Sequence, residues 1–128
     1  MNLAAQSALV HDLHSWWAWV VVLSNGAAGL WALGAHRFEG LRHRALWWFT
    51  AAAQTSIVVQ VVLGISMLEG ERSDAVEFHM FYGFIALFAA AIIYAYRQQL
   101  TQHRYLLYGL GSLFIMGLCI RAMFLDPF

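Results

Sequence analysis

Four long apolar runs constrain this chain more than any other feature of its sequence. They lie at about residues 14–35, 45–68, 79–96 and 105–124. Each is close to the ~20 residues that an α-helix needs to cross the hydrocarbon core of a bilayer. The residues are 62% hydrophobic and 11% charged, whereas soluble domains are about half apolar and about a quarter charged. The sequence therefore predicts an all-α integral membrane protein.

The loops between these runs are short, which limits the topology. Four spans joined by short loops must alternate in direction, so the predicted fold is an antiparallel up-down four-helix bundle that occupies residues 1–128 as one domain. Membrane strands are excluded because they need only about half the length of these runs. With loops this short, we expect the first and third helices to lie diagonally across the core.

Arginine is distributed unevenly between the two ends of the predicted bundle. The loops at 36–44 and 97–104 hold Arg37, Arg42, Arg44, Arg97 and Arg104 with one acid, Glu39. The opposite end holds Arg72 and Arg121 with Asp12, Glu69, Glu71, Asp74, Glu77 and Asp126. Since cytoplasmic loops are enriched in basic residues, the two arginine-rich loops are predicted to be cytoplasmic and both termini extracytoplasmic, in a plasma or inner membrane.

The remaining composition narrows the set of partners. Net charge is zero and lysine is absent, which disfavours nucleic acid as a partner. The expected partners are the lipid bilayer and either other membrane proteins or a second copy of the chain. Cys119 is the only cysteine, so no disulfide forms within the chain. Residues 1–13 lack the basic start of a signal peptide and are expected to lie at the membrane surface as a short helix or loop.

Two histidines open alternate spans at matching depth. His14 begins the first span and His79 the third, and small or polar residues follow each of them at helical spacing. In lipid such residues face the bundle interior. The predicted inward faces are His14, Ala18, Val21, Asn25, Ala28, Gly29, Ala32 and His36; Ser56, Gln60, Gly64 and Met67; His79, Tyr82, Gly83, Ala86, Ala90 and Tyr94; and Phe114, Gly117 and Arg121.

These faces suggest a b-type haem with His14 and His79 as its two iron ligands. Ala18 and Gly83 would leave room for the flat macrocycle, and Gln60 lies on the neighbouring face of the second span. Arg121 is at the depth where a propionate would need a cation. Iron with two imidazole ligands has no open position, so the expected role is electron transfer rather than enzymatic bond chemistry.

Two other interpretations stay open. The histidines could be interfacial and the small residues ordinary helix-packing surfaces, with Asn25 and Gln60 bonding each other, in a cofactor-free accessory subunit of a membrane complex. His11 and His14, spaced i and i+3, could hold zinc or copper together with His79, Asp12 or Glu77. The histidines in or beside the arginine-rich loops are expected to be solvated: His36, His43 and His103.

One stretch also carries a family resemblance. The run Gln60-Val-Val-Leu-Gly64, a short outer loop and then His79 resemble one half of heme A synthase, over about residues 10–97. Small b-type membrane cytochromes share the paired-histidine pattern. Asp12 precedes His14 by two residues rather than three, and no arginine follows the histidine, so the family's catalytic carboxylate is not matched. The resemblance implies a haem-binding four-helix unit that transfers electrons or handles haem within a larger respiratory assembly.

Overall fold

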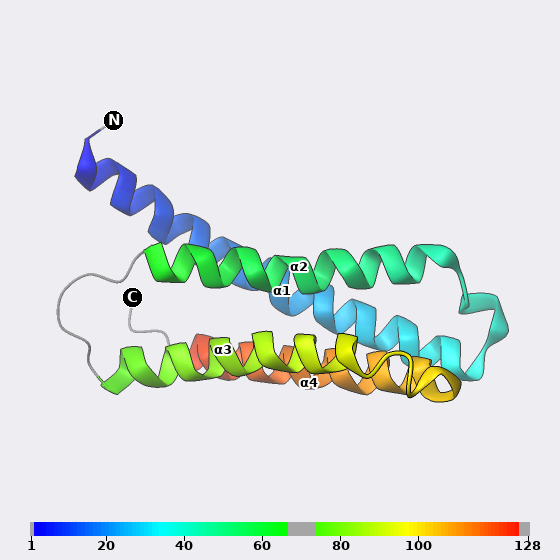
Figure 1. Ribbon diagram of the computed structural model, residues 1–128. Coiled ribbons are helices and arrows are strands. Elements are labelled where there is room, and N and C mark those ends of the chain that lie inside the picture. The colour runs from blue at the N-terminus through cyan, green and yellow to red at the C-terminus, as the bar shows by residue number, and fades with distance from the viewer. Residues whose placement is uncertain (1, 67–73, 126–128) are drawn as a thin grey trace.

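The computed structural model describes residues 2–66 and 74–125, and this part of the chain is helical apart from short turns (Figure 1). The helices are α1 (Leu3–Arg37), α2 (Arg44–Ser66), α3 (Asp74–Ala95) and α4 (Arg104–Phe124), with single 3-10 turns η1 (Glu39–Leu41) and η2 (Thr101–His103). Four helices are long and apolar enough to cross a membrane, as predicted from the sequence. The expected end of the second span, Leu68, lies outside the described residues.

The first helix is longer than predicted. We expected residues 1–13 to be separate from the first span, but residues 3–13 are its first three turns. The Asn2 side chain accepts a hydrogen bond from the Ala5 N–H at 2.8 Å and caps the helix. No glycine or proline interrupts the chain between Leu3 and Asn25. At 1.5 Å per residue α1 is about 50 Å long, which exceeds the ~30 Å hydrocarbon core.

The helices form a bundle in which α1 and α3 are diagonal, as expected. α1 packs on α2 and α4, and α3 packs extensively on α4 and over a shorter stretch on α2. No backbone positions of α1 and α3 in the described chain come within 8 Å of each other. Any contact between these two helices must therefore come from side chains that reach across the core.

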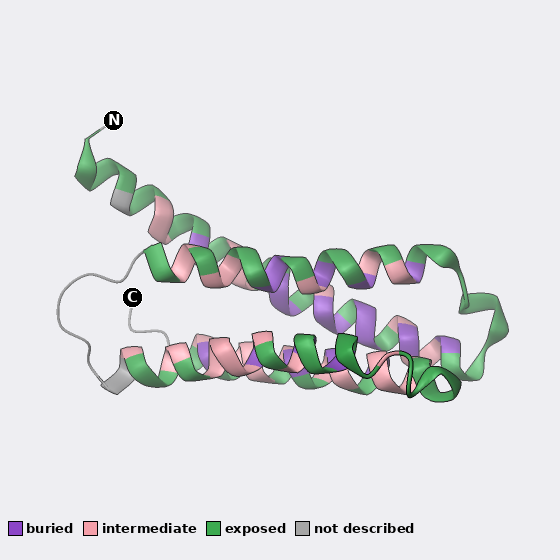
Figure 2. Cartoon of the chain, in the orientation of Figure 1, coloured by how far each residue is buried: buried purple, intermediate pink, exposed green. Residues whose placement is uncertain are grey.

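The predicted inward faces are mostly correct for α1 and partly correct for α2 and α3. Buried positions are concentrated along α1 (Figure 2) and include all its predicted inward residues except Ala18, which is half-buried, and His36, which is exposed. On α2, Ser56 is buried and Gln60 and Gly64 are half-buried; on α3, Ala86 and Ala90 are buried, while Tyr94 is exposed.

The predicted face of α4 is wrong. Phe114, Gly117 and Arg121 are exposed, whereas Gly109, Ser112, Ile115 and Ala122 are buried. The prediction had placed Phe114, Gly117 and Arg121 on the inward face. The small residues of α4 at Gly109 and Ser112 instead mark the side that meets the other helices, because small side chains permit close helix approach.

Three side-chain hydrogen bonds join α2 to α1 at successive depths. Gln60 Nε2 donates to the His14 carbonyl at 2.9 Å, Trp17 Nε1 to the Ser56 carbonyl at 2.8 Å, and Asn25 Nδ2 to the Ala53 carbonyl at 3.2 Å. Asn25 and Gln60 therefore bond backbone carbonyls of the facing helix rather than each other. These bonds fix the register of the two helices.

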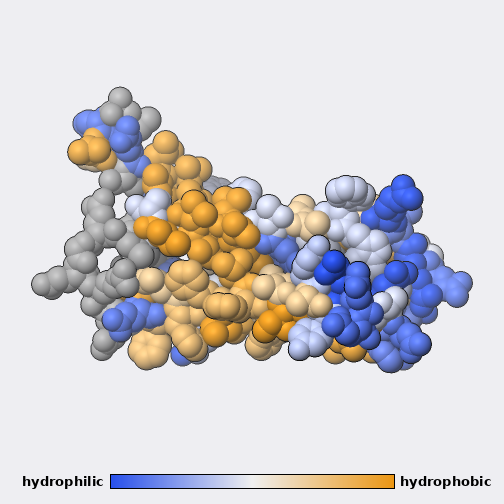
Figure 3. All heavy atoms as spheres, viewed as in Figure 1, coloured by the Kyte–Doolittle hydropathy of each residue, from blue (hydrophilic) through white to orange (hydrophobic). Residues whose placement is uncertain are grey.

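The end of the bundle with residues 38–43 and 97–104 is the more polar one (Figure 3). Two of its arginines, Arg42 and Arg97, bond carbonyls and lie over aromatic rings. Arg42 donates to the carbonyls of Ala35 and His36 at the end of α1, at 2.7 and 3.0 Å. Arg97 lies 3.7 Å from the centre of the Tyr94 ring, and such pairs of cation and aromatic ring suit a membrane–water interface.

Candidate functional site

A cavity of about 260 Å³ lies between all four helices, at the end of the bundle opposite the arginine-rich loops. His14 and Ala18 of α1, Gln60 and Gly64 of α2, and Gly83 of α3 are among its lining residues. His79 of α3 and three residues of α4 complete the wall that faces His14: Cys119, Ala122 and Met123. Five residues that were predicted to bind a cofactor therefore line one cavity: His14, Ala18, Gln60, His79 and Gly83.

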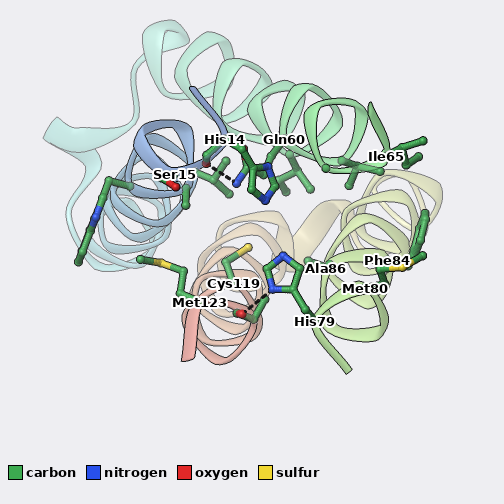
Figure 4. A pocket seen from close by; sticks show the side chains of 18 residues that line it. His14, Ser15, Gln60, Ile65, His79, Met80, Phe84, Ala86, Cys119 and Met123 are labelled. Carbon is green, nitrogen blue, oxygen red and sulfur yellow. Dashed lines mark hydrogen bonds between the residues drawn. The ribbon is translucent and has the colours of Figure 1, made fainter. Parts of the chain in front are cut away.

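The two histidines face each other across this cavity (Figure 4). Their ring centroids are 5.9 Å apart, with the ring planes at 70°. Because α1 and α3 are diagonal, these side chains bridge the widest direction of the bundle. An atom bound by both imidazoles through bonds of about 2 Å would separate the ring centres by about 6 Å. The spacing thus suits two ligands of one metal ion.

A backbone carbonyl fixes the chemistry of the His79 ring. Nδ1 of His79 lies 2.7 Å from the carbonyl oxygen of Ala122 on α4 (Figure 4). A carbonyl only accepts hydrogen bonds, so Nδ1 carries the proton and the lone pair of the neutral ring is on Nε2. Metal-binding histidines commonly use their other ring nitrogen in this way, and the bond holds both tautomer and orientation.

His14 is held between α1 and α2. His14 is only 5% exposed. A Cβ built on Gly64 would lie 3.2 Å from Cε1 of His14, so the imidazole occupies space that a side chain at position 64 would need. The Gln60 hydrogen bond to the His14 carbonyl anchors the same turn of α1. The oxygen of the same Gln60 amide, Oε1, is buried with no hydrogen-bond partner in the described chain.

Gly83 differs from Gly64, because a Cβ built on it would meet nothing within 4 Å. It therefore leaves open space on the α3 wall, one turn from His79. Ala18 is small and half-buried on the opposite wall. Both residues are small and line the cavity.

Two predicted site residues lie apart from the cavity. Arg121 is exposed, and its guanidinium carbon is 5.9 Å from the centre of the Tyr82 ring. It does not line the cavity. His11 is half-buried on α1 and is also outside the lining. Within residues 2–66 and 74–125 no three histidine, cysteine, aspartate or glutamate side chains are grouped to hold a metal ion, so the zinc or copper alternative has no third such ligand there.

Sequence reasoning missed several lining residues on each of the four helices. They are Ser15, Trp19, Ile57, Val61, Ile65, Met80, Phe84, Cys119, Ala122 and Met123. The α4 residues could have been found by stepping from Ser112 in threes and fours, which reaches Ile115, Cys119 and Ala122. The Ala122 carbonyl has no signature in the sequence, because any residue offers one.

No family model, no curated protein and no solved structure matches this chain. The cavity and its two imidazoles are therefore the basis for any functional proposal.

Proposed function

We propose that the cavity binds haem b, with His14 and His79 as axial ligands, and that the protein transfers electrons or handles haem within a larger membrane assembly. The observation that carries this proposal is the 5.9 Å separation of two imidazole rings from diagonal helices inside one cavity. Bound haem would supply one-electron redox chemistry. With two protein ligands the iron has no open position, which favours electron transfer over bond-making reactions.

The residues fit the group in donor chemistry and in the shape of the cavity walls. His79 presents Nε2 because Ala122 accepts from Nδ1. Gly64 admits the His14 ring, and Gly83 leaves the facing wall open. At about 260 Å³ the cavity is smaller than the ~300–1,000 Å³ of most ligand pockets, so part of a porphyrin would lie outside it.

The chain's own residues would tune and shield such a group. The cavity lining is mostly apolar, which excludes water and lowers the local dielectric constant around a redox centre. Ala122 stabilises one imidazole in a single tautomer. Arg121 lies over the ring of Tyr82, with its guanidinium carbon 5.9 Å from the ring centre, and this pair would place a cation and an aromatic ring at the membrane edge.

We further propose the orientation that the arginines favour. The polar end with loops 36–44 and 97–104 would face the cytoplasm, and the cavity would lie near the outer leaflet of a plasma or inner membrane. The support is the asymmetry of arginine and acid between the two ends. Redox partners would then reach the cavity from the extracytoplasmic side or through a neighbouring membrane subunit.

Optical absorption tests the haem proposal directly. The protein purified in detergent from haem-replete cells should show a dithionite-reducible, low-spin haem spectrum. His14→Ala and His79→Ala should each lose that low-spin spectrum, while His103→Ala, an exposed histidine at the other end of the bundle, should retain it. A folded, colourless preparation that also fails to bind added haemin would refute the proposal and favour the cofactor-free accessory subunit.

A further inference from the structure

Two arginines meet over one aromatic ring at the arginine-rich end of the bundle, away from the cavity. Arg42 lies in the connection between α1 and α2, and Arg104 is the first residue of α4; both segments lie at the same end (Figure 1). Each guanidinium carbon is 5.1 Å from the centre of the Tyr105 ring. The two guanidinium carbons are therefore at most about 10 Å apart, although they come from distant parts of the sequence.

The ring between these segments is held in place by α2. The centroids of Tyr105 and Trp47 are 5.5 Å apart, and both side chains are half-buried against a cluster that includes Ala35 and Leu46. The guanidinium carbon of Arg104 is also 5.6 Å from the centre of the Trp47 ring. No backbone positions of α2 and α4 come within 8 Å of each other in the described chain. The two arginines thus lie on a packed aromatic surface that bridges this second diagonal pair of helices.

The charges of these arginines are not neutralised by carboxylates among the described residues. Arg42 donates from Nε and Nη2 to two carbonyls at the end of α1, and Arg104 donates from Nη2 to the Tyr105 hydroxyl at 3.3 Å. These acceptors are uncharged, and Glu39 is the one acid in the two loops at this end. A guanidinium has five N–H donors, so both groups retain donors for an anion.

The surroundings of the arginine pair suit a lipid headgroup better than a dissolved anion. Trp48, which follows Trp47 on α2, is 74% exposed, and indole rings concentrate at the headgroup level of a bilayer. The helices that begin here, α2 and α4, are long and apolar enough to cross a membrane. A phospholipid carries its phosphate directly above its acyl chains. It can therefore bring an anion to the arginines while its chains lie against the apolar outer surface of the bundle.

We propose that Arg42 and Arg104, supported by the Tyr105 and Trp47 rings, bind the phosphate of an anionic phospholipid. Guanidinium groups hold phosphate oxygens through paired, charge-assisted hydrogen bonds, and basic pockets at the ends of membrane helices bind anionic headgroups. The bound lipid joins the α1–α2 connection to the start of α4. Such a site requires that the helices span a membrane, but it requires neither haem in the cavity nor a particular orientation of the chain.

Native mass spectrometry measures the lipid preference directly. The protein in detergent is titrated with phosphatidylglycerol or with phosphatidylcholine of the same acyl chains. We expect the first phosphatidylglycerol to bind about tenfold more tightly, since each arginine near the headgroup favours an anionic lipid severalfold. Arg42→Gln/Arg104→Gln should abolish this preference. Arg37→Gln/Arg44→Gln is the matched control, because it removes the same charge from two exposed arginines at the same end and should retain the preference.

A single variant keeps the test valid if the double variant does not fold, because Arg42 also bonds the end of α1. Arg104→Gln loses only contacts with one hydroxyl and two rings and should lower the preference at least threefold. Equal losses in both double variants would indicate diffuse attraction rather than a site, and equal binding of the two lipids by the native protein would exclude one. Displacement of the lipid by millimolar inorganic phosphate would assign the arginines to a dissolved anion. Each of these three results would overturn the proposal.

The lipid and haem proposals can fail separately in these experiments. The optical spectrum of each sample reports on the cavity, which lies at the other end of the bundle. We expect that spectrum to be the same in the native protein and in all the arginine variants. A lost lipid preference with an unchanged spectrum therefore concerns the arginine pair alone.

Discussion

The imidazole of His14 fills the space that Gly64 leaves on the facing helix, since a Cβ at position 64 would lie 3.2 Å from Cε1 of the ring. Gly83, across the cavity, has no such occupant within 4 Å. The two glycines therefore have different purposes. Gly64 positions a histidine that belongs to the chain, whereas Gly83 keeps open a surface of the cavity that the chain itself does not use.

Gly83→Leu should separate folding from ligand binding. The new side chain would enter open space in the cavity, so we expect the thermal stability of the ligand-free protein to change little or rise, since leucine also favours a helix more than glycine does. Haem binding, measured by titration with haemin, should weaken at least tenfold. Gly117→Leu is the matched control, because Gly117 is exposed on α4 and also meets nothing within 4 Å. Equal haemin affinity in both variants would argue against a macrocycle beside Gly83.

Trp17→Phe should destabilise the bundle by removing one bond between α1 and α2. The indole Nε1 donates to the Ser56 carbonyl at 2.8 Å, and the loss of such a bond costs about 1 kcal/mol. The free energy of unfolding in mixed micelles measures the effect. Trp16→Phe is the control, because Trp16 is 76% exposed and should change stability by less than about 0.5 kcal/mol. A similar loss in both variants would show that ring size, rather than the hydrogen bond, is responsible.

Gly29→Ala should be costly, because α4 lies close against α1 there. The added Cβ would lie 2.9 Å from Cγ of Leu113 and 3.0 Å from the Gly109 carbonyl oxygen. Overpacking of this kind costs about 1–3 kcal/mol, partly offset by the ~1 kcal/mol by which alanine favours a helix over glycine. Denaturant titration in micelles should show a net loss, whereas Gly117→Ala should be neutral or stabilising.

The position of Gly29 also changes how the accessory-subunit alternative can be tested. That alternative predicts that substitutions at Gly29 or Trp16 disturb assembly with partners while the histidine variants are mild. Gly29 is buried against α4 within the chain, so its substitution disturbs the bundle itself and says nothing about partners. Trp16 remains informative, since its exposed ring can contact a neighbouring protein or lipid.

Much of the fold follows from the sequence because hydrophobic length, loop length and small-residue periodicity each have one simple structural outcome in lipid. These features predicted four spans, the diagonal pair and the buried face of α1. They failed on α4, where the predicted face held Phe114, Gly117 and Arg121 but the small residues Gly109 and Ser112 mark the buried side. They also placed the start of α1 near His14, because the more polar residues before it look interfacial although nothing in them stops a helix.

The candidate site was predictable as a pair of histidines but not as a cavity. Matching depth and diagonal helices bring His14 and His79 together, and both properties can be read from the sequence. The carbonyl of Ala122, the contact of Gly64 with His14 and the contributions of Cys119 and Met123 depend on the rotation of α4 and α2 about their axes. A rotation of one residue, 100°, would remove each of them from the cavity.

Cysteine labelling should establish the orientation that the arginines favour. In a Cys119→Ala background, Asn2→Cys lies at the exposed start of α1 and Gln98→Cys in the exposed turn after α3. If both termini are extracytoplasmic, a membrane-impermeant maleimide added to intact cells should label position 2 and not position 98, and permeabilisation should expose both. We expect this labelling pattern because the arginine-rich end of a membrane protein remains on the cytoplasmic side during insertion. Labelling of position 98 alone in intact cells would show that the topology is the reverse of the proposed one. The two facing imidazoles would then lie near the cytoplasmic leaflet, with electron partners on that side.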